Sequence, residues 1–175
     1  MTTQQRVPSI NLIPTVQPAR ADDAGAIAEL LERRAPETIP VPADQVREAI
    51  DNYLVIRAAG RVQATAALFP VDEDDRLELR SVAVNPDFSG HGLGTRIVTA
   101  IQRAAGLRGK GLLCVTTSPE FFARFGFSPA SSETVPPKPE REELPTAEDP
   151  VTMSWQPSEQ HMEGEEQYDD LRRSA

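Results

Sequence analysis

The sequence has few of the residues that build metal sites or disulfides, and it has no long apolar run. Cys114 is the single cysteine beside two histidines, which excludes an intramolecular disulfide and argues against a dedicated zinc site. No stretch approaches the roughly 20 apolar residues of a membrane helix, and the polar start lacks the apolar core of a signal peptide. We therefore expect a soluble, cytoplasmic protein that does not bind membranes.

The charge is acidic and unevenly distributed. Asp and Glu number 27 against 18 Lys and Arg, a net charge of -9, so the basic surface of a nucleic-acid-binding protein is missing. The length suits one domain. We expect a flexible arm over residues 1–14, a folded domain over residues 15–155 and an acidic disordered tail over residues 156–175. Prolines within residues 131–150 predict an extended surface connection.

Hydrophobic periodicity predicts alternating strands and helices. Strands are expected at 15–18, 53–58, 61–69, 77–84, 112–117 and 151–155, and helices at 22–35, 42–51, 93–105 and from 118 onward. In the second hairpin strand, one side is expected to carry Val62, Ala64, Ala66 and Leu68. Asp22 or Asp23 is the expected cap of the first helix. The fold class is α+β, with helices packed on a mainly antiparallel sheet.

A glycine-rich turn over residues 88–96 joins a strand to a helix. Gly90, Gly92 and Gly94 stand at alternate positions, where missing Cβ atoms let backbone N–H groups face one ligand beside a helix N-terminus. This arrangement suits a phosphate or pyrophosphate, although glycines before a helix more often serve only as turns. The Rossmann and Walker A spacings both fail, because the final glycine and the lysine they require are absent.

Three ordered segments resemble the GNAT acyltransferase family. They are Leu79–Pro86 before the turn, Ser89–Gly94 in the turn, and Glu120–Phe127 later in the chain. The resemblance spans residues 15–155. Within the family, the chain most resembles short amino-acid N-acetyltransferases related to N-acetylglutamate synthase. It implies a mixed, mainly antiparallel sheet flanked by helices, in which two central strands splay apart.

The resemblance also implies acetyl-CoA as co-substrate. Its pantetheine arm would pair with the backbone of Val82 and Val84, and its pyrophosphate would lie on amides from Gly90 to Thr95. The full set of expected cofactor-binding residues is Val82, Ala83, Val84, Ser89, Gly90, His91, Gly92, Leu93, Gly94 and Thr95. A strand whose neighbour peels away exposes N–H and C=O groups that an amide-bearing ligand can satisfy. One such N–H would also stabilise the oxyanion formed during attack on the thioester.

Two residues depart from the family pattern. Ser89 stands where Gln or Arg is usual, which removes a long side chain from the turn. Phe122 stands where many members carry a tyrosine that protonates the leaving thiolate, so the thiolate would leave unaided or through water. Residues 39–42 also lack the arginine of a Leu-Pro-Arg run in related sequences, which weakens the case for glutamate as substrate.

Glu78 and Arg80 are the candidate catalytic and substrate-binding residues. They lie two apart on one expected strand and therefore on one face. Glu78 would take the proton of the attacking amine, and Arg80 would hold a substrate carboxylate, a role that suits arginine better than lysine. The alternative for both is a structural ion pair. Cys114 is expected to be a packed small hydrophobe, and the hydroxyls at residues 116–118 to be ordinary polar groups at a strand end.

Three functions remain open. The first is an acetyl-CoA-dependent N-acetyltransferase acting on a small amine, with a glutamate-like amino acid preferred. The second is an acyl-CoA-binding sensor without turnover, which Ser89 and Phe122 favour. The third is detoxification of a non-proteinogenic amine. Exposed strand edges are compatible with a homodimer.

Overall fold

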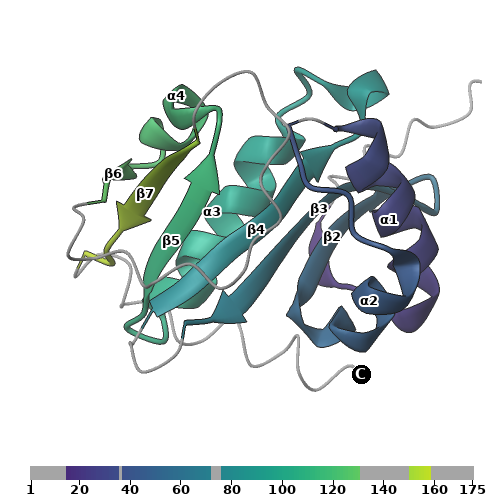
Figure 1. Ribbon diagram of the computed structural model, residues 1–175, viewed down its shortest axis with the longest axis horizontal. Coiled ribbons are helices and arrows are strands. Elements are labelled where there is room, and N and C mark those ends of the chain that lie inside the picture. The colour runs from purple at the N-terminus through teal and green to yellow at the C-terminus, as the bar shows by residue number, and fades with distance from the viewer. Residues whose placement is uncertain (1–14, 36, 72–75, 131–149, 159–175) are drawn as a thin grey trace, which may run out of the picture.

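One mixed sheet of seven strands organises the described chain (Figure 1). The computed structural model describes residues 15–35, 37–71, 76–130 and 150–158. The strands are β1 (Val16–Pro18), β2 (Tyr53–Ala58), β3 (Arg61–Pro70), β4 (Arg76–Val84), β5 (Gly111–Thr116), β6 (Ser128–Pro129) and β7 (Val151–Trp155). Their order is β1-β2-β3-β4-β5-β7-β6, and within it only β4 and β5 run parallel. The expected α+β class and mainly antiparallel sheet are confirmed.

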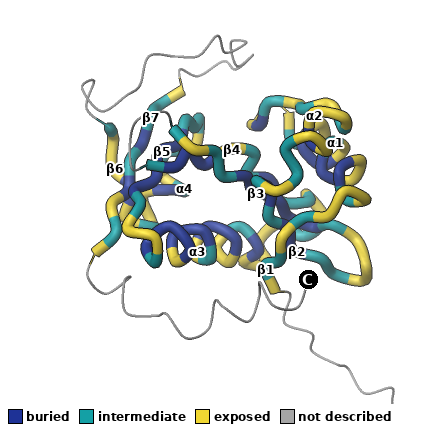
Figure 2. The backbone as a smooth tube through the Cα atoms, turned by 90° about the horizontal axis from the view of Figure 1, so that it is seen from below, coloured by how far each residue is buried: buried dark blue, intermediate teal, exposed yellow. Residues whose placement is uncertain are grey.

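Helices cover both faces of the sheet. They are α1 (Ala24–Arg33), α2 (Ala43–Glu48), α3 (Leu93–Gly106) and α4 (Pro119–Ala123), with short 3-10 turns η1 (Ala21–Asp23), η2 (Ile50–Asn52) and η3 (Pro86–Phe88). Figure 2 shows α1 and α2 on one side of the sheet and α3 on the other. Among the described residues, no helix has the length and apolar character to cross a membrane.

Each face has its own apolar core. Ile97, Val98 and Ile101 of α3 pack with residues that include Leu79 and Cys114. On the opposite face, the core of α1 and α2 includes Ile27, Val46, Val55, Ala67 and Ala83. Apolar residues recur every three to four positions in these helices, which gives each helix one apolar side. The sides predicted from this spacing are the buried ones.

One prediction about β3 was wrong, the side of the strand on which Val62 lies. Val62 packs against the core under α1 and α2, whereas Ala64 and Ala66 belong to the core under α3. The β2–β3 register shifts here, because Ile56 pairs with Ala64 while Arg57 pairs with Val62. The extra residue, a β-bulge, reverses the alternation of side chains.

The predicted helix cap is confirmed in position only, since Asp23 is the N-cap residue of α1. Asp22 and Asp23 lie in η1, and no side-chain cap hydrogen bond is made at the start of α1. The Asp23 carboxylate instead accepts from the Arg20 N–H and pairs with Arg57 of β2. Its charge therefore ties the first turn to the sheet.

Several expected features lie outside the described residues. These are the N-terminal arm at 1–14, residues 131–149 of the connection and the acidic tail beyond residue 158.

Candidate functional site

The central strands β4 and β5 part midway along their length (Figure 1). Their pairing runs from Arg76 opposite Gly111 to Leu79 opposite Cys114. The rest of β4 stays paired with β3, where Ala83 lies opposite Thr65. Within the described part of the chain, this end of β4 therefore has a strand neighbour on one side only.

The backbone direction of the open end of β4 follows from one hydrogen bond. The Asn85 N–H donates to the Gln63 carbonyl at 2.8 Å. Successive residues of an antiparallel strand point their N–H and C=O groups to alternate sides, so Ala83 faces β3 whereas Val82 and Val84 face the opening. The two residues predicted to pair with a pantetheine arm have the required orientation.

The glycine turn follows β4 directly and is tethered to it. The Asn85 side chain accepts from the Asp87 N–H at 3.2 Å and donates to Gln63 at 2.7 Å. Gly90 and Gly92 have φ angles of +78° and +76°, and a Cβ at either would meet no atom within 4 Å. The left-handed backbone and the open space beside it both favour glycine at these two positions.

Gly94 serves a different purpose. It lies in the first turn of α3 with ordinary helical backbone, and a Cβ there would lie 3.1 Å from the Phe121 ring of α4. Its lack of a side chain allows α4 to pack closely against the start of α3. The three glycines that looked alike in the sequence thus divide into two turn residues and one packing residue.

The start of α3 presents a group of amides that can receive an anion. The Arg96 N–H donates to the Gly92 carbonyl at 3.0 Å. Among the described residues, no backbone acceptor is found for the N–H groups of Gly90, Gly92, Leu93, Gly94 and Thr95. These donors, beside a helix dipole and the open space at two glycines, fit a pyrophosphate.

Other amides of the turn are already engaged. The Ser89 N–H donates to the Pro86 carbonyl at 3.1 Å and the His91 N–H donates to the Phe88 carbonyl at 3.3 Å. The His91 ring contacts the Ser89 carbonyl at 3.0 Å. Ser89 and His91 therefore shape the turn, and the neighbouring amides are the ones open to a ligand.

Glu78 and Arg80 lie together where the opening of β4 begins. Their side chains form an ion pair with N···O of 2.5 Å, and the Glu78 side chain is only 12% exposed. The Arg80 guanidinium carbon also lies 4.9 Å from the centre of the Phe69 ring. Burial lowers the pKa of Arg80 from its usual value, and the nearby Tyr53 opposes that shift. The shared face predicted from their spacing is confirmed, and the ion pair between them is the structural alternative to the catalytic and substrate-binding roles.

Arg124 is a cation near the turn that sequence reasoning did not single out. Its guanidinium carbon lies 4.9 Å from the centre of the Phe121 ring, and the Phe121 ring contacts Gly94 at the start of α3. Arg124 is exposed and also lies 5.9 Å from the centre of the Phe125 ring. The Phe-Phe-Ala-Arg-Phe run could have predicted this stack. Phe121 and Arg124 lie three residues apart, a spacing that brings two side chains together on a helix, and arginine stacks favourably on an aromatic ring.

Tyr53 and Ser81 also join the site, although neither was predicted. The Tyr53 side chain is buried and lies near Ser81 and the charge of Arg80. Burial raises the pKa of Tyr53 above its usual 10.0, and the Ser81 side chain and Arg80 oppose the rise. Its phenol is therefore protonated at neutral pH.

Phe122 and Cys114 belong to the core. Phe122 is buried and makes edge contacts with Phe121 and Phe127, at centroid distances of 5.0 and 5.5 Å. Burial raises the pKa of the Cys114 thiol to about 12, so this thiol is un-ionised at neutral pH. The Thr116 hydroxyl accepts from the Ser118 N–H at 2.9 Å, a local hydrogen bond at the strand end.

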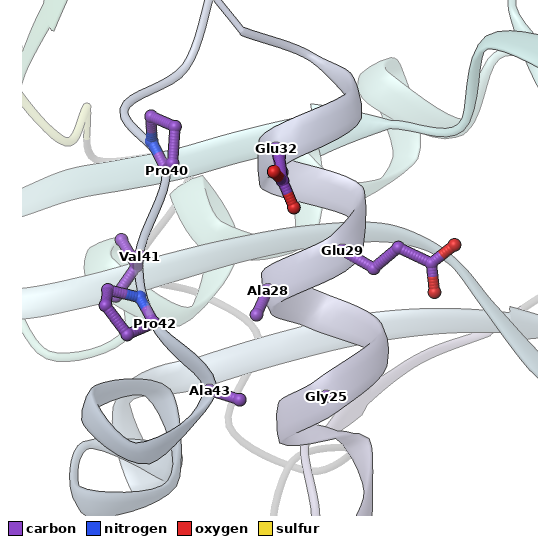
Figure 3. A pocket seen from close by; sticks show the side chains of 8 residues that line it. All are labelled: Gly25, Ala28, Glu29, Glu32, Pro40, Val41, Pro42 and Ala43. Carbon is purple, nitrogen blue, oxygen red and sulfur yellow. The ribbon is translucent and has the colours of Figure 1, made fainter.

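A shallow hollow lies between α1 and the segment before α2 (Figure 3). It is lined by Gly25, Ala28, Glu29, Glu32, Pro40, Val41, Pro42 and Ala43. Figure 3 shows α1 along one side and residues 40–43 along the other. This lining contains two carboxylates and no cation, and it includes none of the predicted site residues.

Comparisons with known proteins agree with this geometry. The family model for the acetyltransferase (GNAT) domain matches residues 49–129. An amino-acid acetyltransferase of Ectopseudomonas mendocina is 30% identical over 126 residues, which cover 70% of this chain and 29% of that protein. One from Azotobacter vinelandii is 31% identical over 122 residues, covering 67% of this chain and 28% of that protein. The chain thus spans under a third of the curated relatives it matches.

Solved structures share the fold. Rv2747 from Mycobacterium tuberculosis, in complex with CoA and NLQ, has a TM-score of 0.69 and 25% identity, covering 82% of this chain and 99% of that one. N-acetylglutamate synthase from Neisseria gonorrhoeae, with coenzyme A and N-acetyl-glutamate, has a TM-score of 0.69 and 20% identity, covering 82% and 35%. The matched residues 49–129 include the opening of β4 and the glycine turn. The chain therefore contains a GNAT acetyltransferase domain.

Proposed function

We propose that this chain transfers the acetyl group of acetyl-CoA to the amine of a small amino acid. The observation that carries the proposal is the open end of β4, which leads directly into a turn with unpaired amides. A ligand with amides along one arm and a pyrophosphate at its end can satisfy both sets of groups. The GNAT domain and the amino-acid acetyltransferases among the relatives support this assignment.

The cofactor would follow β4 toward α3. The backbone of Val82 and Val84 would pair with the pantetheine amides, while the free amides between Gly90 and Thr95 would hold the pyrophosphate. Arg124 would add a cation near this turn, in place of the long side chain that Ser89 does not provide. Because the chain has a net charge of -9, such local donors are needed to hold an anionic ligand.

The proposed chemistry is direct transfer without an acyl-enzyme. Acetyl-CoA supplies the acetyl group as a thioester. The amine nitrogen adds to the thioester carbonyl carbon, and the carbon–sulfur bond breaks when the resulting tetrahedral oxyanion collapses to the amide. Glu78 takes the proton of the amine, directly or through one water. A backbone N–H of the open end of β4 stabilises the oxyanion. Phe122 has no proton to donate, so water would protonate the leaving thiolate.

Arg80 would select the acceptor by holding its carboxylate. Its guanidinium has five donors, so the ion pair with Glu78 leaves others for a substrate. An acceptor with a second carboxylate needs another cation, and residues 39–42 carry no arginine. We therefore propose an α-amino acid as the substrate class, with glutamate as one acceptor to be tested among others.

The first test is CoA release from acetyl-CoA, followed with a thiol reagent. The acceptor panel should contain glutamate, glutamine and uncharged amino acids, together with non-proteinogenic amines and a matched amine without a carboxylate. Turnover that requires the carboxylate supports the proposal. Equal turnover of the amine without a carboxylate would contradict the assigned acceptor class.

The second candidate function is an acyl-CoA sensor, and buried Phe122 is the observation that favours it. Calorimetry with acetyl-CoA distinguishes the two functions when it is run on the same preparation as the kinetics. Binding without turnover over the whole amine panel would establish the sensor. Absence of both binding and turnover would contradict both functions.

A further inference from the structure

Asn85 is the residue at which β4 ends and the glycine turn begins, and each of its polar groups makes a hydrogen bond. Its N–H donates to the Gln63 carbonyl at 2.8 Å, and its carbonyl accepts from the Phe88 N–H at 2.8 Å. Its Nδ2 donates to Gln63 Oε1 at 2.7 Å, and its Oδ1 accepts from the Asp87 N–H at 3.2 Å. Two of these bonds lie within the turn and two hold Asn85 to β3. Asn85 therefore fixes the direction in which the turn leaves the strand.

Gln63 provides both of the bonds on the β3 side, and it is only 5% exposed. Its Oε1 accepts from Asn85, while its Nε2 donates to the Ala58 carbonyl at a long 3.5 Å. Burying an amide is unfavourable unless its polar atoms find partners. An apolar side chain would fill the same space at a lower desolvation cost, so packing alone does not explain a glutamine at this position.

Gln63 is also the extra residue of the bulge between β2 and β3. The described strand β2 pairs with Val62 and with Ala64 and leaves Gln63 between them without a partner. On its other side, β3 continues its register with β4 from Ala64 opposite Val84 to Gln63 opposite Asn85. Side chains directly opposite each other in antiparallel strands lie close together. Bulges beside functional sites commonly redirect a side chain, and this one lets Gln63 meet the first residue of the turn.

The turn that starts at Asn85 carries the amides that fit a pyrophosphate. Short-range bonds build this turn one residue after another, since the Phe88 N–H donates to Asn85 and the Ser89 N–H donates to Pro86. A tilt of Asn85 would therefore rotate the amides that follow. The pair of Gln63 and Asn85 sets the angle between two parts of the cofactor site, the open end of β4 and the amides before α3.

We propose that Gln63 is a positioning residue for acetyl-CoA, which acts through Asn85 to direct the amides of the glycine turn at the pyrophosphate. This inference rests on the pyrophosphate site of the proposed function. Gln63 is buried beneath the turn and does not itself touch the cofactor. Its replacement should weaken binding of the pyrophosphate and leave binding of the pantetheine arm unchanged.

Gln63→Met tests this role with two ligands. Methionine has about the length of glutamine, but its thioether is only a weak acceptor for Asn85. Calorimetry should show an affinity for acetyl-CoA about fivefold to tenfold below wild type, the effect of one lost hydrogen bond. The affinity for S-acetylpantetheine, which lacks the pyrophosphate and the nucleotide, should change less than about twofold when measured by competition with acetyl-CoA. Equal losses for the two ligands would overturn the inference.

A double-mutant cycle with Asn85→Ala shows whether Gln63 acts through Asn85. Asn85→Ala removes the bonds to Gln63 and to the Asp87 N–H, so acetyl-CoA affinity should fall by about tenfold to 50-fold. Adding Gln63→Met to this variant should lower the affinity by less than about twofold more, because the link is already broken. Losses that add in full would show that Gln63 acts independently of Asn85 and would overturn the inference.

Thr65→Val is the matched control in the same strand. Thr65 is fully buried, and its hydroxyl donates to the Leu54 carbonyl at 3.2 Å. Its loss should reduce thermal stability, as Gln63→Met does, while acetyl-CoA affinity stays within about twofold of wild type. An equal loss of affinity in the control would overturn the inference. Gln63→Asn keeps a buried amide but is one methylene shorter, so it should show the same selective loss if Gln63→Met does not fold.

These binding measurements need no turnover, which separates this inference from the proposed function. If the wild-type chain binds acetyl-CoA but releases no CoA with any amine, the proposed transfer fails, and a selective loss in Gln63→Met still establishes the positioning role. Normal turnover with unchanged acetyl-CoA affinity in Gln63→Met would refute the positioning role alone. A wild-type chain that does not bind acetyl-CoA would overturn both.

Discussion

The first half of β4, Arg76–Leu79, has β3 on one side and β5 on the other, whereas the second half, Arg80–Val84, has only β3. The first half contributes Leu77 and Leu79 to the core under α3. The second half leads into the glycine turn with backbone groups facing the opening. The comparison shows that a binding strand can differ from a structural strand by the loss of one neighbour. Substitutions in the two halves should therefore affect different properties.

The largest effect is expected at the turn that ends the open half. Gly92→Val places a β-branched side chain at a φ of +76° and fills the open space beside the free amides. We expect acetyl-CoA affinity to fall at least about 100-fold, because several charge-assisted hydrogen bonds are lost together. Calorimetry on the folded variant measures this fall.

Gly109→Val is the matched control for this substitution. Gly109 has a φ of +63° with open space around it, and it lies after the C-terminus of α3. It carries similar backbone strain at the opposite end of the helix, so stability should fall while affinity is kept. Equal losses of affinity in the two variants would remove the pyrophosphate assignment.

Proline substitutions test the two sides of β4 directly. Val84→Pro removes an N–H that faces the opening, and proline is tolerated in a strand where no ladder bond is lost. We expect a folded protein whose acetyl-CoA affinity falls about tenfold or more, the effect of a lost hydrogen bond together with steric interference. Ala83→Pro removes an N–H that faces β3 and should instead lower thermal stability. If Ala83→Pro lowered the affinity for acetyl-CoA and Val84→Pro lowered thermal stability, the N–H of Ala83, and not that of Val84, would face the opening.

The fold was largely predictable because hydrophobic periodicity is a local property. Spacing identified the strand at 77–84, the turn at 88–96 and the helix after it, and these three elements position the site. The pairing of Glu78 with Arg80 also followed from a period of two. Each of these predictions depends on residues close together in the chain.

The missed features depend on contacts between distant residues. The register shift between β3 and β4, next to Ser81 with its φ of +54°, depends on pairing with a strand that lies earlier in the chain. Val62 changed face for a similar reason, since the extra residue arises in its pairing with β2. Arg124 lies near the glycine turn because the Phe121 ring, on which it stacks, packs against Gly94. The alternation of apolar and polar residues within one strand does not predict its register with neighbouring strands or the bulges in that register.

Two arginines that stack on phenylalanine rings should have intermediate effects on KM, one for the amino acid and the other for acetyl-CoA. Arg80 and Arg124 each lie 4.9 Å from the centre of a phenylalanine ring, Phe69 and Phe121. Arg80→Ala should raise the KM of the amino acid by about 10-fold to 100-fold, as expected when a charged hydrogen-bonded pair is lost. Its KM for acetyl-CoA should stay within about twofold.

Arg124→Ala should produce the reverse pattern. The KM for acetyl-CoA should rise by about three-fold to ten-fold, because an exposed cation contributes modestly to anion binding. The KM of the amino acid should not change. Steady-state kinetics with both substrates varied reports the two values, and identical patterns for both arginines would assign them a shared structural role.

The smallest effect on activity is expected at Cys114, which pairs with Leu79 where the two strands begin to part. Cys114→Ala should leave neutral-pH turnover within about twofold, because a thiol with a pKa of about 12 supplies no nucleophile. The cavity left behind should cost about 1 kcal/mol of stability. Loss of turnover without unfolding would give the thiol a chemical role.

The same thiol predicts a pH dependence of stability. Its pKa is raised from 9.0 to about 12 in the folded state, so above pH 9 the unfolded chain loses the proton first. Stability from this group is intact below pH 9 and falls as the pH rises from 9 toward 12. Urea unfolding of wild type and Cys114→Ala at pH 8 and pH 10.5 isolates the effect. The stability of wild type relative to Cys114→Ala should fall by about 2 kcal/mol, at roughly 1.4 kcal/mol per pH unit, so that the variant becomes the more stable protein at pH 10.5. An unchanged difference between the two proteins would mean that the folded thiol ionises as readily as the unfolded one.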